Sequence, residues 1–416
     1  MTPEVKKRIE QIRQGIVPEG YVKDKDGIYP RDWASKKIGQ WLKLAERSIV
    51  LQDEEEYQLV TIRRGFGGVD SRGSFLGKNV LVKNYFIVKT GDFIISKRQI
   101  AHGACGIVPP ELDGAVVSNE YNVFLPQDGT NIQMFNLMMQ LPHYKRLFYL
   151  MSDGVHIEKL LFKTQDWMKR TLAMPLLKEQ KKIAEILSTQ DKAIELQGRK
   201  IEELKRFKKG CLEKMFPRKG QKVPEKRFPG FTDDWEQRKL GDVVQITMGQ
   251  SPDGSTYSDE PSDYILVQGN ADLQNGWVCP RIWTTQITKK ADAGDLIMSV
   301  RAPAGAMGKT AYNAVIGRGV AAIKGNEFIY QLLVKMDTDG FWKTLSCGST
   351  FESLNSDNIK NAEVKIPTTA EQIKIGGFFQ YLDNLITLHQ RKLEEMEKQK
   401  KALMQLLLTG IVRVQS

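Results

Sequence analysis

The stretch Val300–Thr310 comes closest to a catalytic motif, and it reads VRAPAGAMGKT. A phosphate-binding P-loop needs Gly, four residues and then Gly-Lys-Ser/Thr, with a strand before it and a helix after it. Pro303 stands where the first glycine belongs, and the residues after Thr310 are rich in Gly, Val and Ile, which is typical of strands and turns. We therefore interpret the stretch as a loop between strands and expect no nucleotide hydrolysis there.

Other residue types that carry catalysis do not group into a recognisable site. The sequence lacks the Asn/Asp-Pro-Pro-Tyr/Phe tetrapeptide of enzymes that methylate a base amino group. Asp357, Glu363 and Lys365 resemble a nuclease cluster only faintly, because the aspartate lies too close and no second signature accompanies it. The four cysteines form no Cys-x-x-Cys pair and the four histidines no metal-binding pattern. We predict no catalytic residue, metal or cofactor in this chain.

The composition predicts a soluble protein with an anionic partner. The 416 residues carry a formal net charge of +11 and have a sequence pI near 9.2, which favours nucleic acid. No apolar run reaches the roughly 18 residues of a membrane span. The N-terminus, MTPEVKKRIEQIRQG, predicts a short charged helix without the apolar core of a signal peptide. We expect a cytoplasmic location and no membrane contact.

Most of the chain consists of an internal sequence repeat with two copies. The residues from Pro175, PLLKEQKKIAEILSTQDKAIELQGRK, align without a gap with those from Pro367, PTTAEQIKIGGFFQYLDNLITLHQRK, at a shift of 192 (367 minus 175). Upstream, DWASKKIGQ at Asp32 matches DWEQRKLGD at Asp234, and GDFIISKR at Gly91 matches GDLIMSVR at Gly294. Since a repeat decides the whole architecture, we interpret each half as a globular body followed by a long helix.

The repeat also gives the P-loop-like stretch a twin. In the first body GDFIISKRQIAHGACGIV occupies the same place, so that Gly305–Gly308 lies opposite Gly103–Gly106. Ile-Val then stands where the second body has Lys309-Thr310. The lysine and threonine are therefore local to one copy, which supports a strand–loop–strand element in a duplicated body.

Basic and amide side chains gather in the loops between the predicted strands. Arg, Lys, Asn and Gln hydrogen-bond base edges, and Lys and Arg also neutralise phosphates. For any single residue a solvated loop charge explains the pattern equally well, but matching positions in two copies favour DNA contact. The candidates are Arg63, Arg64, Arg72, Lys97, Arg98, Gln99, Asn119, Gln250, Ser251, Gln268, Asn270, Arg301, Lys309, Arg318, Ser349 and Thr350.

Each half ends in a helix of about 40 residues with heptad spacing, which spans roughly 60 Å. Neither apolar stripe is continuous enough to stand alone in water, so the simplest arrangement pairs the two helices antiparallel, with a body at each end of a rod. The alternative is a helix packed on its own body. The predicted contact positions are Ile183, Leu187, Ile194, Ile201, Leu204, Ile375, Phe379, Ile386, Leu393, Met396 and Leu403.

These patterns predict an α+β fold: two mixed α/β bodies joined by two long helices that form an antiparallel coiled coil, with a pseudo-twofold internal repeat. Strands dominate both bodies, and short helices are expected at Phe135–Tyr149 and Phe328–Leu345. The predicted boundaries are a first body at 1–174, its helix at 175–216, a linker rich in Pro, Gly and charge at 217–231, a second body at 232–366 and its helix at 367–410.

The combination resembles the specificity subunit of type I restriction–modification systems over nearly the whole chain. FPGFTDDWEQRKLGDV at Phe228 looks like the opening of that family's second target recognition domain. GSTFESLNSDNIKNAEVKIPTTAEQIKI at Gly348 looks like its passage into the conserved helix, and LLKEQKKIAEILSTQDKAIE is the counterpart in the first half. ISKRQIAHGACGIVPPELDGAVVSNEYNVF resembles one recognition-domain subtype.

The resemblance implies that each body reads one half of a bipartite sequence in double-stranded DNA. The helices would set the gap between the half-sites and dock two modification subunits, which bind S-adenosylmethionine and methylate adenine. Restriction subunits that use ATP and Mg would join them, and this chain would do no chemistry. Gly376-Gly377, where the first copy has Ala184-Glu185, departs from the pattern and predicts a later start or a bend in the second helix.

Two other classes of function stay open at this point. One is an autonomous DNA-binding protein without enzymatic partners, and the other is an NTPase. A co-purifying methyltransferase would separate the first class from the resemblance, and ATP binding by the isolated chain would reveal the second.

Overall fold

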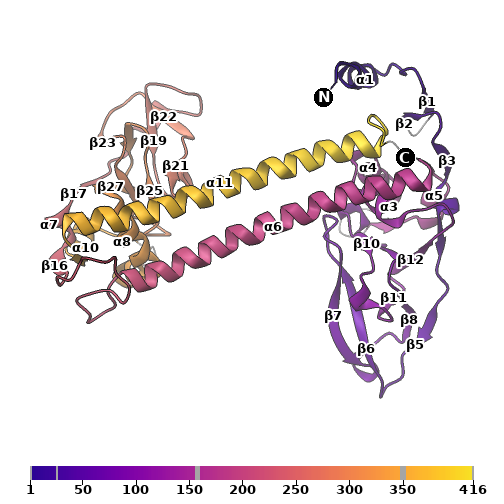
Figure 1. Cartoon of the computed structure of the whole chain (residues 1–416), viewed down its shortest axis with the longest axis horizontal. Helices are drawn as coiled ribbons and strands as arrows, with labels where there is room; N and C mark the ends of the chain where they lie inside the picture. The colour runs from indigo at the N-terminus through magenta and orange to yellow at the C-terminus, as the bar shows by residue number, and fades with distance from the viewer. Residues whose placement is uncertain (1, 25–26, 155–159, 347–352, 415–416) are drawn as a thin grey trace. The chain divides into compact units, whose positions relative to one another are not determined.

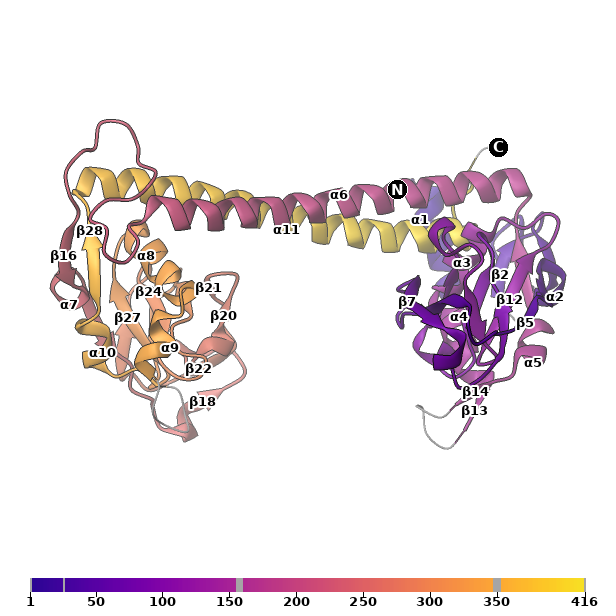
Figure 2. The same cartoon turned by 90° about the horizontal axis from the view of Figure 1, so that it is seen from below.

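The computed structural model describes residues 2–24, 27–154, 160–346 and 353–414. The chain divides into two compact units. Unit 1 comprises Met1–Glu195 with Glu394–Ser416, and unit 2 comprises Leu196–Leu393. The long helices α6 (Leu177–Met215) and α11 (Thr369–Leu408) run through both units, as Figure 1 and Figure 2 show. Each unit therefore contains one globular body and a segment of each long helix. Neither long helix, nor any other described one, is apolar enough over a sufficient length to cross a membrane.

The body of unit 1 is built on two sheets whose buried faces meet. Strand β9 is apolar along its length because both of its faces are covered: Phe93 and Ile95 belong to one core, and Ile94 belongs to the core between the sheets. The four-stranded sheet has the order β10-β9-β12-β4 and the five-stranded sheet the order β5-β8-β11-β6-β7. Their strands are β4 (Leu42–Leu44), β5 (Ser48–Val50), β6 (Glu56–Ile62), β7 (Val69–Leu76), β8 (Asn84–Ile87), β9 (Phe93–Ser96), β10 (Cys105–Ile107), β11 (Val116–Ser118) and β12 (Tyr121–Pro126).

Short helices and two-stranded pairs complete unit 1. The pairs are β1 (Tyr21–Asp24) with β2 (Gly27–Pro30), β3 (Ala34–Lys37) with β15 (Thr171–Met174) and β13 (Ser152–Asp153) with β14 (Leu161–Phe162). The helices are α1 (Pro3–Arg13), α2 (Ile38–Trp41), α3 (Ile132–Met139), α4 (Pro142–Leu150) and α5 (Thr164–Met168).

Unit 2 repeats this plan. Strand β24 is again covered on both faces, with Leu296 and Met298 in one core and Ile297 in the other. The sheet orders are β17-β27-β24-β25-β21-β20 and β18-β22-β19-β26-β23, and a separate pair joins β16 to β28. The strands are β16 (Glu236–Lys239), β17 (Gln245–Met248), β18 (Tyr257–Ser258), β19 (Tyr264–Val267), β20 (Leu273–Gln274), β21 (Trp277–Val278), β22 (Ile282–Thr284), β23 (Lys289–Ala291), β24 (Leu296–Ser299), β25 (Met307–Lys309), β26 (Ala314–Ile316), β27 (Val320–Lys324) and β28 (Glu363–Ile366). The helices are α7 (Leu240–Val243), α8 (Glu327–Thr338), α9 (Phe341–Ser346) and α10 (Ser356–Lys360).

Strand pairing fixes which elements correspond between the units. β6 pairs in parallel with β11, and β19 pairs in parallel with β26. β9 lies between β10 and β12, and β24 between β25 and β27. Leu296 to Lys309 therefore corresponds to Phe93 to Ile107. The stretch Val300–Thr310 connects β24 to β25, so the prediction of a strand–loop–strand element is confirmed.

Each of the two short helices expected from the sequence is in fact a pair. Pro142 occupies the first turn of α4, where its missing N–H costs nothing, and this separates α4 from α3. Gly340, with a φ of 76°, separates α8 from α9. The same kind of residue starts α3 and α8: the side chains of Asn131 and Asn326 each accept a backbone N–H of the first turn.

The two long helices pack antiparallel within each unit. In unit 2, Gln197 donates to His389 O at 2.8 Å, and Lys208 Nζ lies 2.6 Å from Asp383 Oδ1. In unit 1, Gln190 Nε2 donates to Met396 O at 3.4 Å, and Lys400 pairs with Asp191. All eleven predicted contact positions are buried or half-buried. These polar pairs occupy repeated positions, because Asp191 and Lys208 align with Asp383 and Lys400.

Helix α11 begins at Thr369 and continues through Gly376-Gly377, so the expected later start is wrong. A Cβ on Gly376 would lie 2.9 Å from Phe328 N and 3.1 Å from Glu327 Cβ, whereas a Cβ on Gly377 would meet nothing within 4 Å. Gly376 is therefore required by the close approach of the first turn of α8.

An arginine outside each long helix holds a buried glutamate near its start. In unit 1, Arg413 binds Glu179 with Oε2 at 2.7 Å and also pairs with Asp32, which lowers the pKa of the Asp32 carboxyl. In unit 2, Arg227 from the predicted linker binds both oxygens of Glu371 at 2.7 Å. Since Glu179 and Glu371 are repeat partners, the linker and the C-terminal tail play equivalent roles: each supplies the arginine that binds the buried glutamate of a long helix.

Candidate nucleic-acid interface

Four of the predicted residues in unit 2 line a single cavity of about 610 Å³. Ser251 follows β17, Gln268 follows β19, Arg301 follows β24 and Arg318 lies between β26 and β27. Along the sequence, Gln268 lies 17 residues after Ser251 (268 minus 251), Arg301 lies 33 residues after Gln268 (301 minus 268), and Arg318 lies 17 residues after Arg301 (318 minus 301). The cavity is completed by Pro252, Gly254, Tyr257 and Gly319.

Backbone contacts hold the walls of this cavity in place. Gln250 N donates to Ile316 O at 2.9 Å, and Gly249 N donates to Val320 O at 3.0 Å. Ser251 Oγ accepts the Arg318 N–H at 3.2 Å. Gly319 cannot be replaced without rearrangement, because a Cβ there would lie 2.0 Å from Gln268 O. The backbone of the loop that carries Arg318 is therefore held in place, while the Arg318 side chain stays exposed.

The electrostatics of the cavity are dominated by its two guanidinium groups. Arg301 and Arg318 are both exposed, and neither side chain has an ion-pair or hydrogen-bond partner within the described part of the chain. The carboxylates nearest in sequence are engaged elsewhere. Asp272 accepts from Gln268 N, Gly269 N and Arg281 Nε, and Asp253 accepts from Ser255, which lowers the pKa of Asp253.

The structure removes Lys309 from the set of DNA-contact candidates. Its Nζ lies 2.9 Å from Glu327 Oε2, 4.9 Å from the centroid of the Trp277 ring and 4.6 Å from that of the Tyr330 ring. The Lys309 side chain is only 12% exposed. Gln331 then links Glu327 to Asp383, which binds Lys208. This lysine therefore belongs to an internal network between β25, α8, α11 and α6.

Two further candidates of unit 2 lie on exposed loops outside the lining of the cavity. Gln250 and Asn270 are exposed on the loops after β17 and β19. The Gln250 carbonyl accepts from Thr288 Oγ1, which ties this loop to the segment before β23. Ser349 and Thr350 lie outside the described residues.

In unit 1 the corresponding loops carry the other candidates and are joined by hydrogen bonds. Gly65 N donates to His102 O at 2.7 Å, which connects the loop after β6 to the loop after β9. Lys97 N donates to Glu120 O at 2.9 Å, which connects the loop after β9 to the β11–β12 loop. Arg63 and Arg64 lie on the first loop, Lys97, Arg98 and Gln99 on the second, and Asn119 on the third, with Arg72 exposed on β7.

Two arginines of unit 1, Arg63 and Arg98, differ from Arg301 and Arg318 of unit 2 because carboxylates face them. Arg98 Nε lies 2.6 Å from Glu120 Oε2, and Arg98 Nη2 lies 3.4 Å from Glu120 Oε1. Arg63 pairs with Asp70 across the β6–β7 hairpin. Glu120 stands in the loop that corresponds to the Arg318 loop of unit 2. The sequence indicated the shared loop positions, but it did not reveal these carboxylate partners or the cavity wall at Tyr257.

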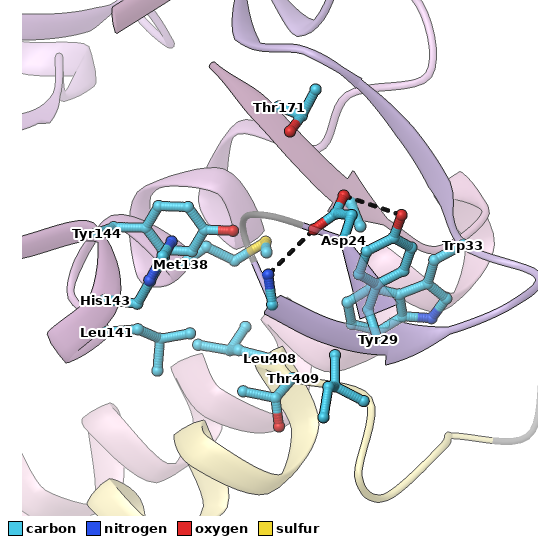
Figure 3. Close-up of a pocket in the computed structure, with 13 residues that line it drawn as sticks. Asp24, Tyr29, Trp33, Met138, Leu141, His143, Tyr144, Thr171, Leu408 and Thr409 are labelled. Atoms are coloured by element: carbon cyan, nitrogen blue, oxygen red, sulfur yellow. Dashed lines mark hydrogen bonds between the residues drawn. The ribbon is translucent and has the colours of Figure 1, made fainter. Parts of the chain in front are cut away.

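A second cavity, of about 240 Å³, lies in unit 1 between the β1–β2 hairpin, α4, β15 and the end of α11 (Figure 3). Its lining is largely apolar and includes Trp33, Leu141 and Leu408. The Asp24 carboxylate accepts hydrogen bonds from Gly27 N and Tyr29 Oη. None of the predicted DNA-contact residues that the structure describes lines this cavity, so it forms no part of the candidate interface.

Two copies of one body, each with basic and amide side chains on adjacent loops, define a duplicated binding protein. Among the described residues no group of three His, Cys, Asp or Glu is placed to hold a metal ion. Residues 30–206 and 232–398 match the family "Type I restriction modification DNA specificity domain". The chain belongs to this family.

Relatives of known description agree with this membership. The chain is 27% identical over 421 residues to the "Putative type I restriction enzyme MjaX specificity subunit" of Methanocaldococcus jannaschii, covering 96% of this chain and 98% of that protein. The MjaVIII specificity subunit of the same organism is 23% identical, with 93% and 94% covered.

Solved structures show the same fold. A chain from a study of complex assembly and conformational transition of the type I R-M system superposes with a TM-score of 0.59 at 22% identity, covering 92% of this chain and 99% of that chain. The type I restriction-modification S subunit from M. genitalium gives a TM-score of 0.54 at 14% identity, covering 92% and 97%.

Proposed function

We propose that this chain is the sequence-specific DNA-recognition subunit of a type I restriction–modification complex. The body of unit 1 reads one half of a bipartite target in double-stranded DNA, and the body of unit 2 reads the other. The long helices set the gap between the half-sites and dock two modification subunits. Those subunits bring S-adenosylmethionine and methylate adenine, and restriction subunits that use ATP join them. This chain itself is non-catalytic.

One observation carries this proposal. In both units the loops after β6 or β19, after β9 or β24, and between β11 and β12 or β26 and β27 present Arg, Lys, Asn or Gln. These side chains form hydrogen bonds with base edges and phosphates. Family membership over both halves supports assigning these loops to DNA.

The test is to purify the tagged chain from its host with its bound subunits and to select duplexes from a random library. We expect a bipartite motif with a constant gap and an adenine methyltransferase among the bound proteins. R98A, in unit 1, should change the selected bases in one half-site only, and N270A, in unit 2, should change the other. Both loops are exposed, so neither variant should alter folding.

Three outcomes would contradict the proposal. If wild type selects no motif, the recognition role is lost. If either variant changes both half-sites, the units do not read DNA separately. If wild type selects a bipartite motif but no methyltransferase accompanies it, the chain is an autonomous DNA-binding protein instead.

A further inference from the structure

The cavity of unit 2 has the chemistry of an anion site. Its two guanidinium groups, on Arg301 and Arg318, come from two different loops, and the described residues that line it include no carboxylate. Ser251 Oγ accepts from Arg318 N, so its hydroxyl hydrogen stays available to a ligand. Two guanidinium forks and one hydroxyl donor match the oxygens of a phosphate.

The shape of the site separates phosphate binding from base reading. Base edges lie at the floor of a groove and are reached by side chains that project from the protein. Arg301 and Arg318 instead line a concave space of about 610 Å³, which suits the protruding phosphates of the DNA backbone. The tight packing of Gly319 on Gln268 O keeps this concavity open, because a side chain there would displace the loop.

Unit 1 lacks this pair of unneutralised arginines at the corresponding positions. Asn119 stands where unit 2 has Arg318, and the next residue, Glu120, neutralises Arg98, the repeat partner of Arg301. Arg63 is likewise neutralised by Asp70. The local charge of these pairs is close to zero, whereas Arg301 and Arg318 together contribute two uncompensated positive charges within the described part of unit 2.

We propose that the cavity formed by Ser251, Arg301 and Arg318 is a phosphate clamp for the DNA backbone, and that unit 1 lacks the equivalent clamp because Asn119 replaces Arg318 and Glu120 neutralises Arg98. This inference rests on the proposed function, since it takes DNA as the ligand. Unit 2 then supplies the salt-dependent anchoring, and unit 1 contributes mainly sequence-dependent contacts.

The experiment measures the affinity of the full chain, purified with its bound subunits, for a random-sequence duplex over a range of salt concentrations. Each phosphate neutralised contributes about 0.9 to the slope of log K against log salt. R301Q/R318Q should reduce the slope by at least that amount, and R301K/R318K should keep it because the charge remains. E120Q should raise the slope by about 0.9, because it releases Arg98 for a phosphate.

R98Q/E120Q is the matched control for unit 1. It replaces a neutral ion pair with a neutral polar pair and should leave the slope at the wild-type value. Thermal unfolding of each variant should stay unchanged, since these arginines are exposed.

An unchanged slope in R301Q/R318Q would overturn the clamp. So would the loss of a base position from the selected motif at constant slope, which would assign the arginines to base reading. Failure of the proposed function shows itself separately, as the absence of any motif for wild type.

Discussion

At the scale of single residues, Lys309 shows how far a motif can mislead. Its neighbours suggest phosphate chemistry, but its ammonium is held by Glu327 and by the faces of Trp277 and Tyr330. Burial raises the pKa of the Tyr330 phenol, so the ring stays neutral beside the lysine. The unit 1 counterparts of Lys309 and Glu327 are Ile107 and Ile132, which both pack against the apolar core. The same two positions thus hold an ion pair in unit 2 and two isoleucines in unit 1.

This exchange predicts a pair of variants with opposite outcomes. K309M should lower the free energy of unfolding by about 3 kcal/mol, because Glu327 is left nearly buried without its cation. K309I/E327I copies unit 1 and should lie within about 1 kcal/mol of wild type, since replacing both partners removes the unpaired charge. Urea denaturation followed by tryptophan fluorescence measures both values. A double variant as unstable as K309M would show that the pair is needed for more than charge balance.

At the scale of elements, the two adjacent glycines of α11 have different reasons to be glycine. Gly376 faces the first turn of α8, and Gly377 faces open space. Gly377 therefore lowers the helix propensity of α11, and no close contact in unit 2 explains why this residue is glycine.

The two glycines form a matched pair for mutation. G377A should raise the free energy of unfolding by up to about 1 kcal/mol, the difference in helix propensity between alanine and glycine. G376A gains the same propensity but places a methyl group 2.9 Å from Phe328 N, so it should be destabilised relative to G377A by more than about 1 kcal/mol. Denaturant unfolding of the two variants decides this, and equal stabilities would mean that α8 can move away.

The elements were largely predictable from the sequence, because period and repeat are local signals. The predicted helix boundaries lie within two residues of α6 and α11, and the loop nature of Val300–Thr310 was readable from its twin. The split of the short helices also has a sequence signal, because Pro142 favours the first turn of a helix and Gly340 favours the end of one.

Side-chain partnership in the candidate site could not be predicted in the same way. Glu120 reaches Arg98 from 22 residues away, and the side chains of Arg301 and Arg318 share a cavity across 17 residues. Those meetings depend on strand register and loop geometry, which hydrophobic patterns do not specify. The residue types in the loops were therefore predictable from the sequence. The net charge that remains after arginines pair with carboxylates was not.

At the scale of the whole molecule, the internal repeat lets one chain present two related but different loop surfaces. The duplicated parts that hold the structure have changed little: Glu179 and Glu371 are both held by arginine, and Asp191 and Asp383 both pair with a lysine. The loops have diverged, with Asn119 and Glu120 opposite Arg318 and Gly319. Shared scaffolding with divergent loops is what separate reading of two half-sites requires.

If the helices set the gap between half-sites, lengthening them together should lengthen the gap. Both helices pass from one unit to the other at matching points, α6 after Glu195 and α11 after Leu393. One heptad inserted at both points keeps the apolar register and adds about 10 Å, which corresponds to about three base pairs. The motif selected from a random library should keep both half-sites and gain about three base pairs between them. The same heptad inserted in α6 alone should weaken binding, because Lys208 and Asp383 lose their register with the rest of α6. An unchanged gap in the double insertion would show that something other than these helices sets the distance.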